Sequence, residues 1–83
     1  MRVLTLNISN EIKLDCFNSM FGQESIYYND ELVSEKRSMW GATHNFEIEE
    51  DGEIANYKIV YKHDDYGGIR VNIYRNNTVI LLN

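Results

Sequence analysis

The chain has 83 residues, with 13 acidic and 8 basic side chains, a net charge of −5, six Tyr, three Phe, one Trp and no proline. This length predicts one domain, residues 1–83, whose core is too small to enclose a large substrate cavity. The acidic balance argues against binding to nucleic acid or to anionic membrane surfaces, and no apolar run approaches the ~20 residues of a membrane span.

Apolar and polar residues alternate in the first part of the chain, which predicts strands over residues 2–8 and 12–17. The second strand places Cys16 on its apolar face, so we expect a buried structural thiol. The loop that follows, residues 18–23, carries Met20 and Phe21. We expect these two side chains to close one end of the core.

Two further short strands, residues 25–28 and 32–36, flank Asn29-Asp30-Glu31, which predicts a three-residue hairpin loop. Asn29 or Asp30 can take the left-handed backbone conformation there, because both tolerate it better than most residues. Trp40 follows a polar segment and is the only Trp of the chain. In so small a domain we expect its side chain in or near the core.

The clearest local signal is a hairpin between residues 43 and 62. Thr43–Glu49 alternates Phe46 and Ile48 with polar residues, and Asn56–Lys62 alternates in the same way. Asp51-Gly52 lies between the two runs, and an Asp-Gly pair favours a tight turn because Gly accepts a positive φ.

The last third of the chain predicts a loop and one more strand pair. His63–Gly68 has turn residues at both ends, Ile69–Arg75 alternates cleanly, and Asn76-Asn77 fits a two-residue turn before a strand over residues 78–82. No segment has the apolar spacing of a helix. The expected fold is all-β, a small antiparallel β-sandwich of about seven or eight short strands joined by hairpins.

A series of these features resembles a known family. Gly22 precedes a strand, Tyr28 and Val33 flank a turn, and Trp40-Gly41 is followed by the hairpin strands and the pair joined by Asn76-Asn77. Residues 12–82 resemble one module of the Fas apoptotic inhibitory molecule family, with Asn29-Asp30 where that family tends to have Asp-Gly. The resemblance implies a sandwich fold and a non-enzymatic, protein-binding role.

Cysteine and histidine are too scarce and too widely spaced to indicate a site of chemistry. Cys16, His44 and His63 lack the close spacing of zinc ligands. We expect a partly buried His44, an exposed His63, no metal and no cofactor. A lone cysteine cannot form an internal disulfide and favours a reducing compartment, so we expect a soluble, cytoplasmic protein.

Acidic residues concentrate at the predicted hairpin turn, where five carboxylates occur within seven residues. One interpretation is a solvated turn, and the other is an acidic patch that binds a basic partner surface. The loop after the hairpin adds further candidates. The predicted partner-binding residues are Glu47, Glu49, Glu50, Asp51, Glu53, Asp64, Asp65 and Tyr66.

Two hypotheses for the function follow. The first is a non-enzymatic protein-binding module, an adaptor or inhibitor of a basic partner protein, by analogy with small acidic inhibitors from phage or mobile elements and with toxin-immunity proteins. The second is a small-molecule-binding or enzymatic β module that uses a Tyr-rich face and His44. A homodimer formed through an edge strand is a further alternative for the assembly.

Overall fold

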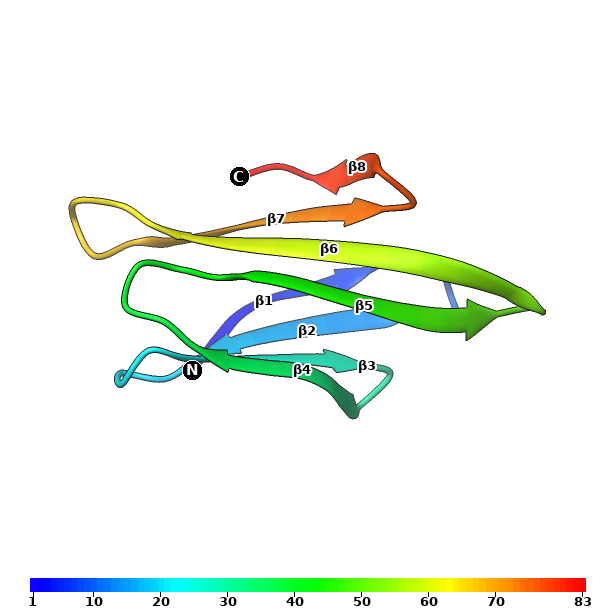
Figure 1. Cartoon of the computed structure of the whole chain (residues 1–83), viewed down its shortest axis with the longest axis horizontal. Helices are drawn as coiled ribbons and strands as arrows, with labels where there is room; N and C mark the ends of the chain where they lie inside the picture. The colour runs from blue at the N-terminus through cyan, green and yellow to red at the C-terminus, as the bar shows by residue number, and fades with distance from the viewer. The chain divides into compact units, whose positions relative to one another are not determined.

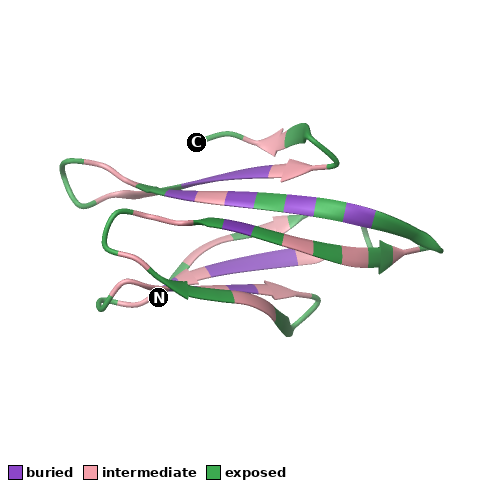
Figure 2. Ribbon diagram, viewed as in Figure 1, coloured by how far each residue is buried: buried purple, intermediate pink, exposed green.

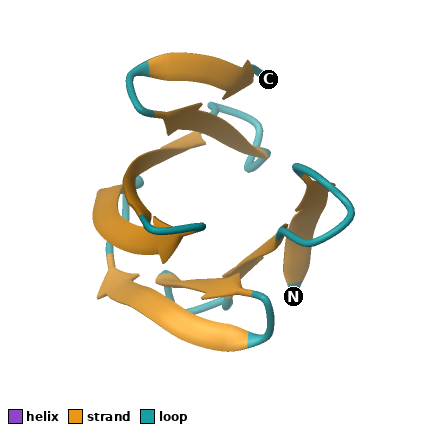
Figure 3. Ribbon diagram, turned by 90° about the vertical axis from the view of Figure 1, so that its right-hand side faces the viewer, coloured by secondary structure: helices purple, strands orange, loops and turns teal.

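The computed structural model describes residues 1–83 and contains eight β-strands and no helix (Figures 1 and 3). It therefore contains no helix that could span a membrane. The strands form two four-stranded antiparallel sheets, one in each of two compact units, Met1–Met39 and Trp40–Asn83. The predicted all-β class, with hairpin-connected antiparallel strands, is confirmed.

The first unit is a sheet of four consecutive hairpin-linked strands. They are β1 (Arg2–Asn7), β2 (Lys13–Asn18), β3 (Gln23–Tyr28) and β4 (Glu31–Arg37), in the order β1-β2-β3-β4. Leu14, Cys16 and Ile26 are fully buried on one face, as alternation predicts for Cys16. The pairing of β1 with β2 and that of β3 with β4 each contain a register shift.

The second unit repeats the same simple order. Its strands are β5 (Thr43–Glu50), β6 (Glu53–His63), β7 (Ile69–Arg75) and β8 (Thr78–Leu81), in the order β5-β6-β7-β8. All eight residues of β5 pair with β6 without interruption, whereas the pairing of β7 with β8 contains a register shift.

Alternation is clearest along β6, where buried and exposed residues change at almost every step (Figure 2). Tyr57, Ile59 and Tyr61 are at most 2% exposed, and Lys58 and Lys62 between and beside them are exposed. Each of the buried residues points to the same face because successive side chains of a strand point to opposite faces. The sequence therefore predicts the orientation of this strand correctly.

Three hairpins close through two-residue turns whose central residues both have positive φ, the geometry that matches the twist of paired strands. They are Asn29-Asp30, Asp51-Gly52 and Asn76-Asn77. The second and third turns agree with the prediction. The predicted three-residue loop at 29–31 is wrong, because Glu31 already pairs with Tyr28 and only Asn29 and Asp30 remain in the turn.

Three large apolar residues lie in solvent instead of in the core. Trp40 is 82% exposed, Met20 89% and Phe21 75%. All three lie in connections between strands, where no alternation fixes which way a side chain points, so size alone was a poor guide. His63 is also half-buried instead of exposed, whereas His44 is fully buried.

Gly41 allows the connection after Trp40 to run close to β6. Its φ is +100°, and a Cβ at this position would collide with the backbone carbonyl of Tyr61. The backbone therefore approaches β6 closely, and the Tyr61 N–H donates a hydrogen bond of 3.0 Å to the Ala42 carbonyl. This bond extends the β5–β6 pairing by one residue.

The exposure of Trp40 leads to a stability prediction. Trp40→Ala should change the free energy of unfolding by no more than about 0.5 kcal/mol, as is usual for surface substitutions. Ile59→Ala is the comparison, because Ile59 is fully buried, and it should cost about 2–5 kcal/mol. Urea or thermal unfolding of the two variants measures both values, and a loss at Trp40→Ala that equals the loss at Ile59→Ala would contradict the exposure.

Candidate functional site

The five acidic residues of the β5–β6 hairpin do not form one cluster. Alternation places Glu47 and Glu49 on one face of β5 and Glu50 on the other, beside Ile48. Asp51 lies in the turn. The sequence predicts five solvated carboxylates, and this is wrong for one of them, because the Glu50 side chain is only 8% exposed.

Glu50 is held by two side chains of neighbouring strands. The Tyr57 hydroxyl donates a hydrogen bond to Glu50 Oε2, and the Arg75 guanidinium donates two to Glu50 Oε1, from Nε at 3.1 Å and from Nη2. Arg75 Nε also donates to the Tyr57 oxygen at 3.3 Å. This cluster therefore neutralises the charge of Glu50 internally. The signal was present in the sequence, because Glu50 is two residues from Ile48 on an alternating strand.

The cluster shifts the pKa of both partners of Glu50. Burial of the Tyr57 ring, and then its hydrogen bond to Glu50, raise the pKa of Tyr57 to about 12. The hydrogen bond to Glu50 also raises the pKa of Arg75. Tyr57 stacks on Phe46 with 5.2 Å between the ring centroids. Tyr57 is therefore a buried structural hydroxyl that stays protonated at physiological pH.

The other four carboxylates of the hairpin are exposed and have no cationic partner. Glu47, Glu49, Asp51 and Glu53 take part in none of the ion pairs or side-chain hydrogen bonds of the structure. Lys58 pairs with Asn45 on the Glu47 face, and it lies over the Tyr74 ring, with 4.7 Å between Nζ and the ring centroid. We name these four residues the acidic hairpin.

The loop after β6 contains the other three predicted residues. The Asp64 carboxylate accepts hydrogen bonds from the N–H groups of Gly68 at 2.7 Å and Tyr66 at 2.9 Å. These two bonds, that of Gly68 first, lower the pKa of Asp64. Asp65 and Tyr66 are exposed, and Tyr66 is 98% exposed. Asp64 thus holds the conformation of the loop, in which Asp65 and Tyr66 are exposed to solvent.

The loop and the acidic hairpin do not meet. They lie at opposite ends of β6, which runs from Glu53 to His63. At about 3.3 Å per residue, the two ends of this strand are roughly 30 Å apart. The eight predicted residues are therefore at least two separate surfaces. Within the acidic hairpin, Glu47 and Glu49 share one face of the sheet, whereas Glu53 pairs with Glu50 and lies on the other face.

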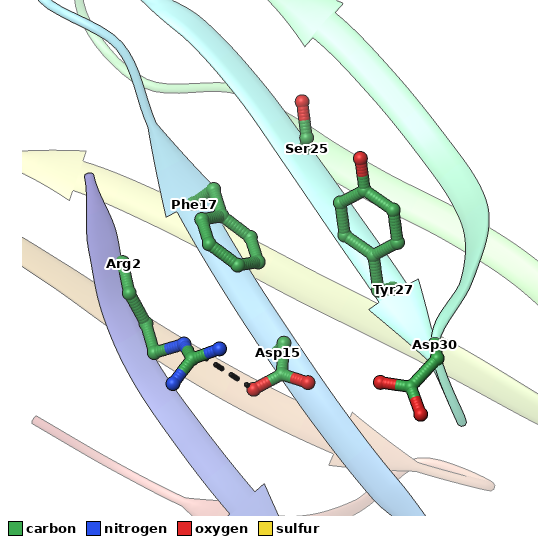
Figure 4. Close-up of a pocket in the computed structure, with 6 residues that line it drawn as sticks. All are labelled: Arg2, Asp15, Phe17, Ser25, Tyr27 and Asp30. Atoms are coloured by element: carbon green, nitrogen blue, oxygen red, sulfur yellow. Dashed lines mark ion pairs between the residues drawn. The ribbon is translucent and has the colours of Figure 1, made fainter.

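A hollow that the sequence did not indicate lies on the sheet of the first unit (Figure 4). Its volume is about 400 Å³. Phe17 and Tyr27 meet edge to face in it, with 5.4 Å between their centroids. The lining residues are Arg2, Asp15, Phe17, Ser25, Tyr27 and Asp30. They come from three strands and a turn, so no local pattern in the sequence gathers them.

The charges in this hollow are already paired within the chain. The Asp15 side chain is 5% exposed, with Arg2 Nε and Lys13 Nζ both at 3.6 Å. The Thr5 hydroxyl donates a hydrogen bond to Asp15 Oδ1. Asp30 points toward Asp15 (Figure 4) and accepts from Lys13 Nζ at 3.0 Å, which raises the pKa of Lys13. The carboxylates of this hollow are therefore already neutralised by cations of the chain itself.

The raised pKa of Tyr57 predicts a loss of stability at alkaline pH. In the unfolded chain a tyrosine deprotonates near 10.0, whereas folded Tyr57 keeps its proton to about 12. Between these values the unfolded chain binds fewer protons than the folded protein, so stability falls as the pH rises. The contribution is complete below pH 10 and is lost as the pH passes about 12.

Thermal unfolding across this pH window measures the effect. The parent should lose stability more steeply than Tyr57→Phe, which has no hydroxyl to titrate at this position. Tyr66→Phe is a matched control, because it removes an exposed hydroxyl and keeps the buried one. Equal slopes for the parent and Tyr57→Phe would show that burial and the hydrogen bond to Glu50 do not hold this proton.

Asp64 predicts a local effect on the β6–β7 loop. Asp64→Ala removes the acceptor of two backbone hydrogen bonds, so the amide protons of Tyr66 and Gly68 should exchange faster with solvent. Because the pKa of Asp64 is lowered, the parent should keep this protection above the ordinary carboxyl pKa and lose it on further acidification. Hydrogen exchange by NMR measures both effects, and Asp65→Ala should leave the two amides unchanged.

Comparisons of the chain with protein-family models, with characterised proteins and with solved structures find no match. None of them bears on the resemblance to the Fas apoptotic inhibitory molecule family, which stays a prediction. Of the residues on which it rests, Tyr28 ends β3 and Trp40 lies in the connection between β4 and β5.

Proposed function

We infer that this chain is a non-enzymatic protein-binding module, an adaptor or inhibitor that recognises a basic surface of its partner through the acidic hairpin. The observation that carries this proposal is the contrast between the acidic residues of the second unit. Glu50 is bound by Arg75 and Tyr57, whereas Glu47, Glu49, Asp51 and Glu53 are exposed and unpaired.

The negative charges of these four residues are not needed to form the hairpin. The turn needs only Asp51 and Gly52, which supply the two positive φ values. Like charges held close together repel, so the acidic hairpin opposes its own formation to a small degree. A basic partner surface would relieve that repulsion, and complementary charge also speeds the encounter of two proteins.

The hairpin presents the carboxylates at fixed positions. Glu47 and Glu49 are two residues apart on one face of a strand whose register with β6 is unbroken. Their Cα atoms are therefore about 6.6 Å apart, from the usual rise of a strand. A pair of basic side chains with the same spacing on a partner fits this surface without rearrangement of the backbone.

The alternative function, a ligand-binding or enzymatic module on a Tyr-rich face with His44, receives less support. His44 is fully buried and Tyr57 and Tyr61 are each 2% exposed, with the His44 and Tyr61 rings 5.2 Å apart. A ligand would have to displace packed side chains to reach them. We therefore favour the acidic hairpin as the functional surface.

The test compares two variants of equal net charge. Glu47→Gln with Glu49→Gln removes two charges from the acidic hairpin, and Glu11→Gln with Glu31→Gln removes two exposed charges from the other unit. A substitution at Glu50 is unsuitable, because it would also disturb the bonds to Tyr57 and Arg75. In quantitative capture from cell extract, the partner should be retained by the parent and by the control pair and depleted with the hairpin pair.

Association kinetics with the captured partner then distinguish long-range electrostatic attraction during the encounter from direct contacts in the complex. The hairpin variant should associate severalfold more slowly at low salt, and the difference should shrink as salt rises, because the Debye length falls from about 10 Å at 0.1 M to about 3 Å at 1 M. Equal retention and equal association rates for the parent and the hairpin variant would overturn the proposal. Equal losses in both variants would show an effect of net charge alone.

A further inference from the structure

The four edge strands of the two sheets are not equivalent. β1 and β4 are the edges of the first sheet, and β5 and β8 are those of the second. The pairings of β1, β4 and β8 with their neighbours each contain a register shift. β5 alone is regular over all its residues, and with eight it is the longest of the four. Irregular or short edges discourage further strand pairing, and a long regular edge permits it.

The hydrogen-bonding phase of β5 shows which of its backbone groups face the free edge. The Tyr61 N–H donates to the Ala42 carbonyl, which makes these opposed residues a hydrogen-bonded pair. Such pairs recur at every second residue of an antiparallel ladder. Phe46 with Tyr57 and Glu50 with Glu53 are therefore hydrogen-bonded pairs as well, as a two-residue turn requires.

It follows that Asn45, Glu47 and Glu49 direct their N–H and C=O groups away from β6. Residues 45–49 make no hydrogen bond beyond their pairing with β6. The side chains of the same three residues are exposed on one face. Each of these three residues thus offers one backbone N–H and one C=O at the free edge, and two of the three, Glu47 and Glu49, have a carboxylate side chain.

We propose that a basic segment of the partner adds to β5 as an antiparallel strand, with Lys or Arg at alternate positions opposite Glu47 and Glu49. This inference rests on the proposed function and specifies how the partner binds the acidic hairpin. A partner residue opposite Glu47 exchanges both backbone hydrogen bonds with it, and directly opposed side chains lie on the same face. Two alternate residues of the partner therefore each face a carboxylate.

The charge of the edge selects this occupant over a second copy of the chain. Two copies of β5 laid antiparallel would bring both Glu47 and both Glu49 carboxylates onto one face of adjacent strands. Like charges in that arrangement are destabilising, and opposite charges are stabilising. Half-exposed Phe46 and Ile48 lie on the other face, so apolar residues between the basic positions of the partner complete the match.

The probe is a short acetylated and amidated peptide that alternates valine with three lysines. Two analogues keep its charge and differ only in backbone methylation. In one, the backbone nitrogens of the lysines are methylated, which removes the N–H groups that would bond to the backbone of Glu47 and Glu49. In the other, the valine nitrogens are methylated, and these N–H groups would point away from β5. Amide chemical shifts of the protein are followed during titration with each peptide.

The unmodified and valine-methylated peptides should shift the amides of Asn45, Glu47 and Glu49 and slow their exchange, and the lysine-methylated peptide should not. Asn45→Pro removes one outward N–H without a change in charge and should weaken binding, while Asn45→Ala should not. Glu47→Gln with Glu49→Gln should weaken it by about threefold or more.

Each contrary result has a distinct meaning. Equal binding of all three peptides, lost in the Glu47 and Glu49 variant, would overturn strand addition and leave the acidic hairpin as an electrostatic surface. No shift at residues 45–49 with any peptide up to millimolar concentration would overturn this inference, whereas the capture experiment above decides the proposed function independently. A concentration-dependent dimer that Asn45→Pro abolishes, measured by sedimentation, would assign the edge to a second copy and overturn it as well.

Discussion

The register of the β5–β6 hairpin is the constraint on which the proposed partner-binding surface depends. Asp51 and Gly52 both take positive φ, so the turn has two residues and Glu50 must face Glu53. Because side chains alternate, a slip of one residue would turn every side chain to the opposite face. Glu50 would then leave Tyr57 and Arg75, and Glu49 would enter the apolar face. One turn therefore decides which carboxylate is structural and which are free.

Two carboxylates that are buried in this protein contrast with those of the acidic hairpin. Glu50 and Asp15 are each nearly inaccessible and are each contacted by an arginine and a hydroxyl. Burial of a charge without such partners would be costly, so these contacts are what make the positions tolerable. Glu47 and Glu49 are solvated, which requires no partner for folding. Their charge is therefore available for another molecule, and that availability distinguishes them from the structural pair.

The sequence predicts best what depends on neighbours along the chain. Alternation places Tyr57, Ile59 and Tyr61 correctly, and Asp51-Gly52 and Asn76-Asn77 are recognised as turns because their residue types tolerate positive φ. The same alternation also predicts that Glu50 lies on the Ile48 face. Counting the acidic residues between 47 and 53 did not take into account which face of the strand each one occupies. Asn29-Asp30-Glu31 was predicted as a three-residue loop with Asn29 or Asp30 in the left-handed conformation, whereas both residues adopt it in a two-residue turn.

Features that depend on distant residues or on connections were beyond this reasoning. The hollow joins Arg2, Phe17 and Tyr27, which neighbour one another only through the register of three strands. Trp40 was placed by its size, but a residue in a connection has no alternation to orient it, and it is exposed. The strand edges were also unknown, because strand order and register shifts are properties of pairing and not of any single segment.

Protection of the β5 edge and the strand addition that we propose there follow from the same charges. The other three edges are made irregular by register shifts, which hinder any added strand whatever its charge. On β5 the backbone is regular, and only the charge of Glu47 and Glu49 opposes a strand of like charge. A bulge hinders the addition of any strand, whereas the charge of Glu47 and Glu49 repels an acidic strand and attracts a basic one. Loss of these two carboxylates would therefore remove the discrimination between partner and second copy while leaving the β5–β6 ladder intact.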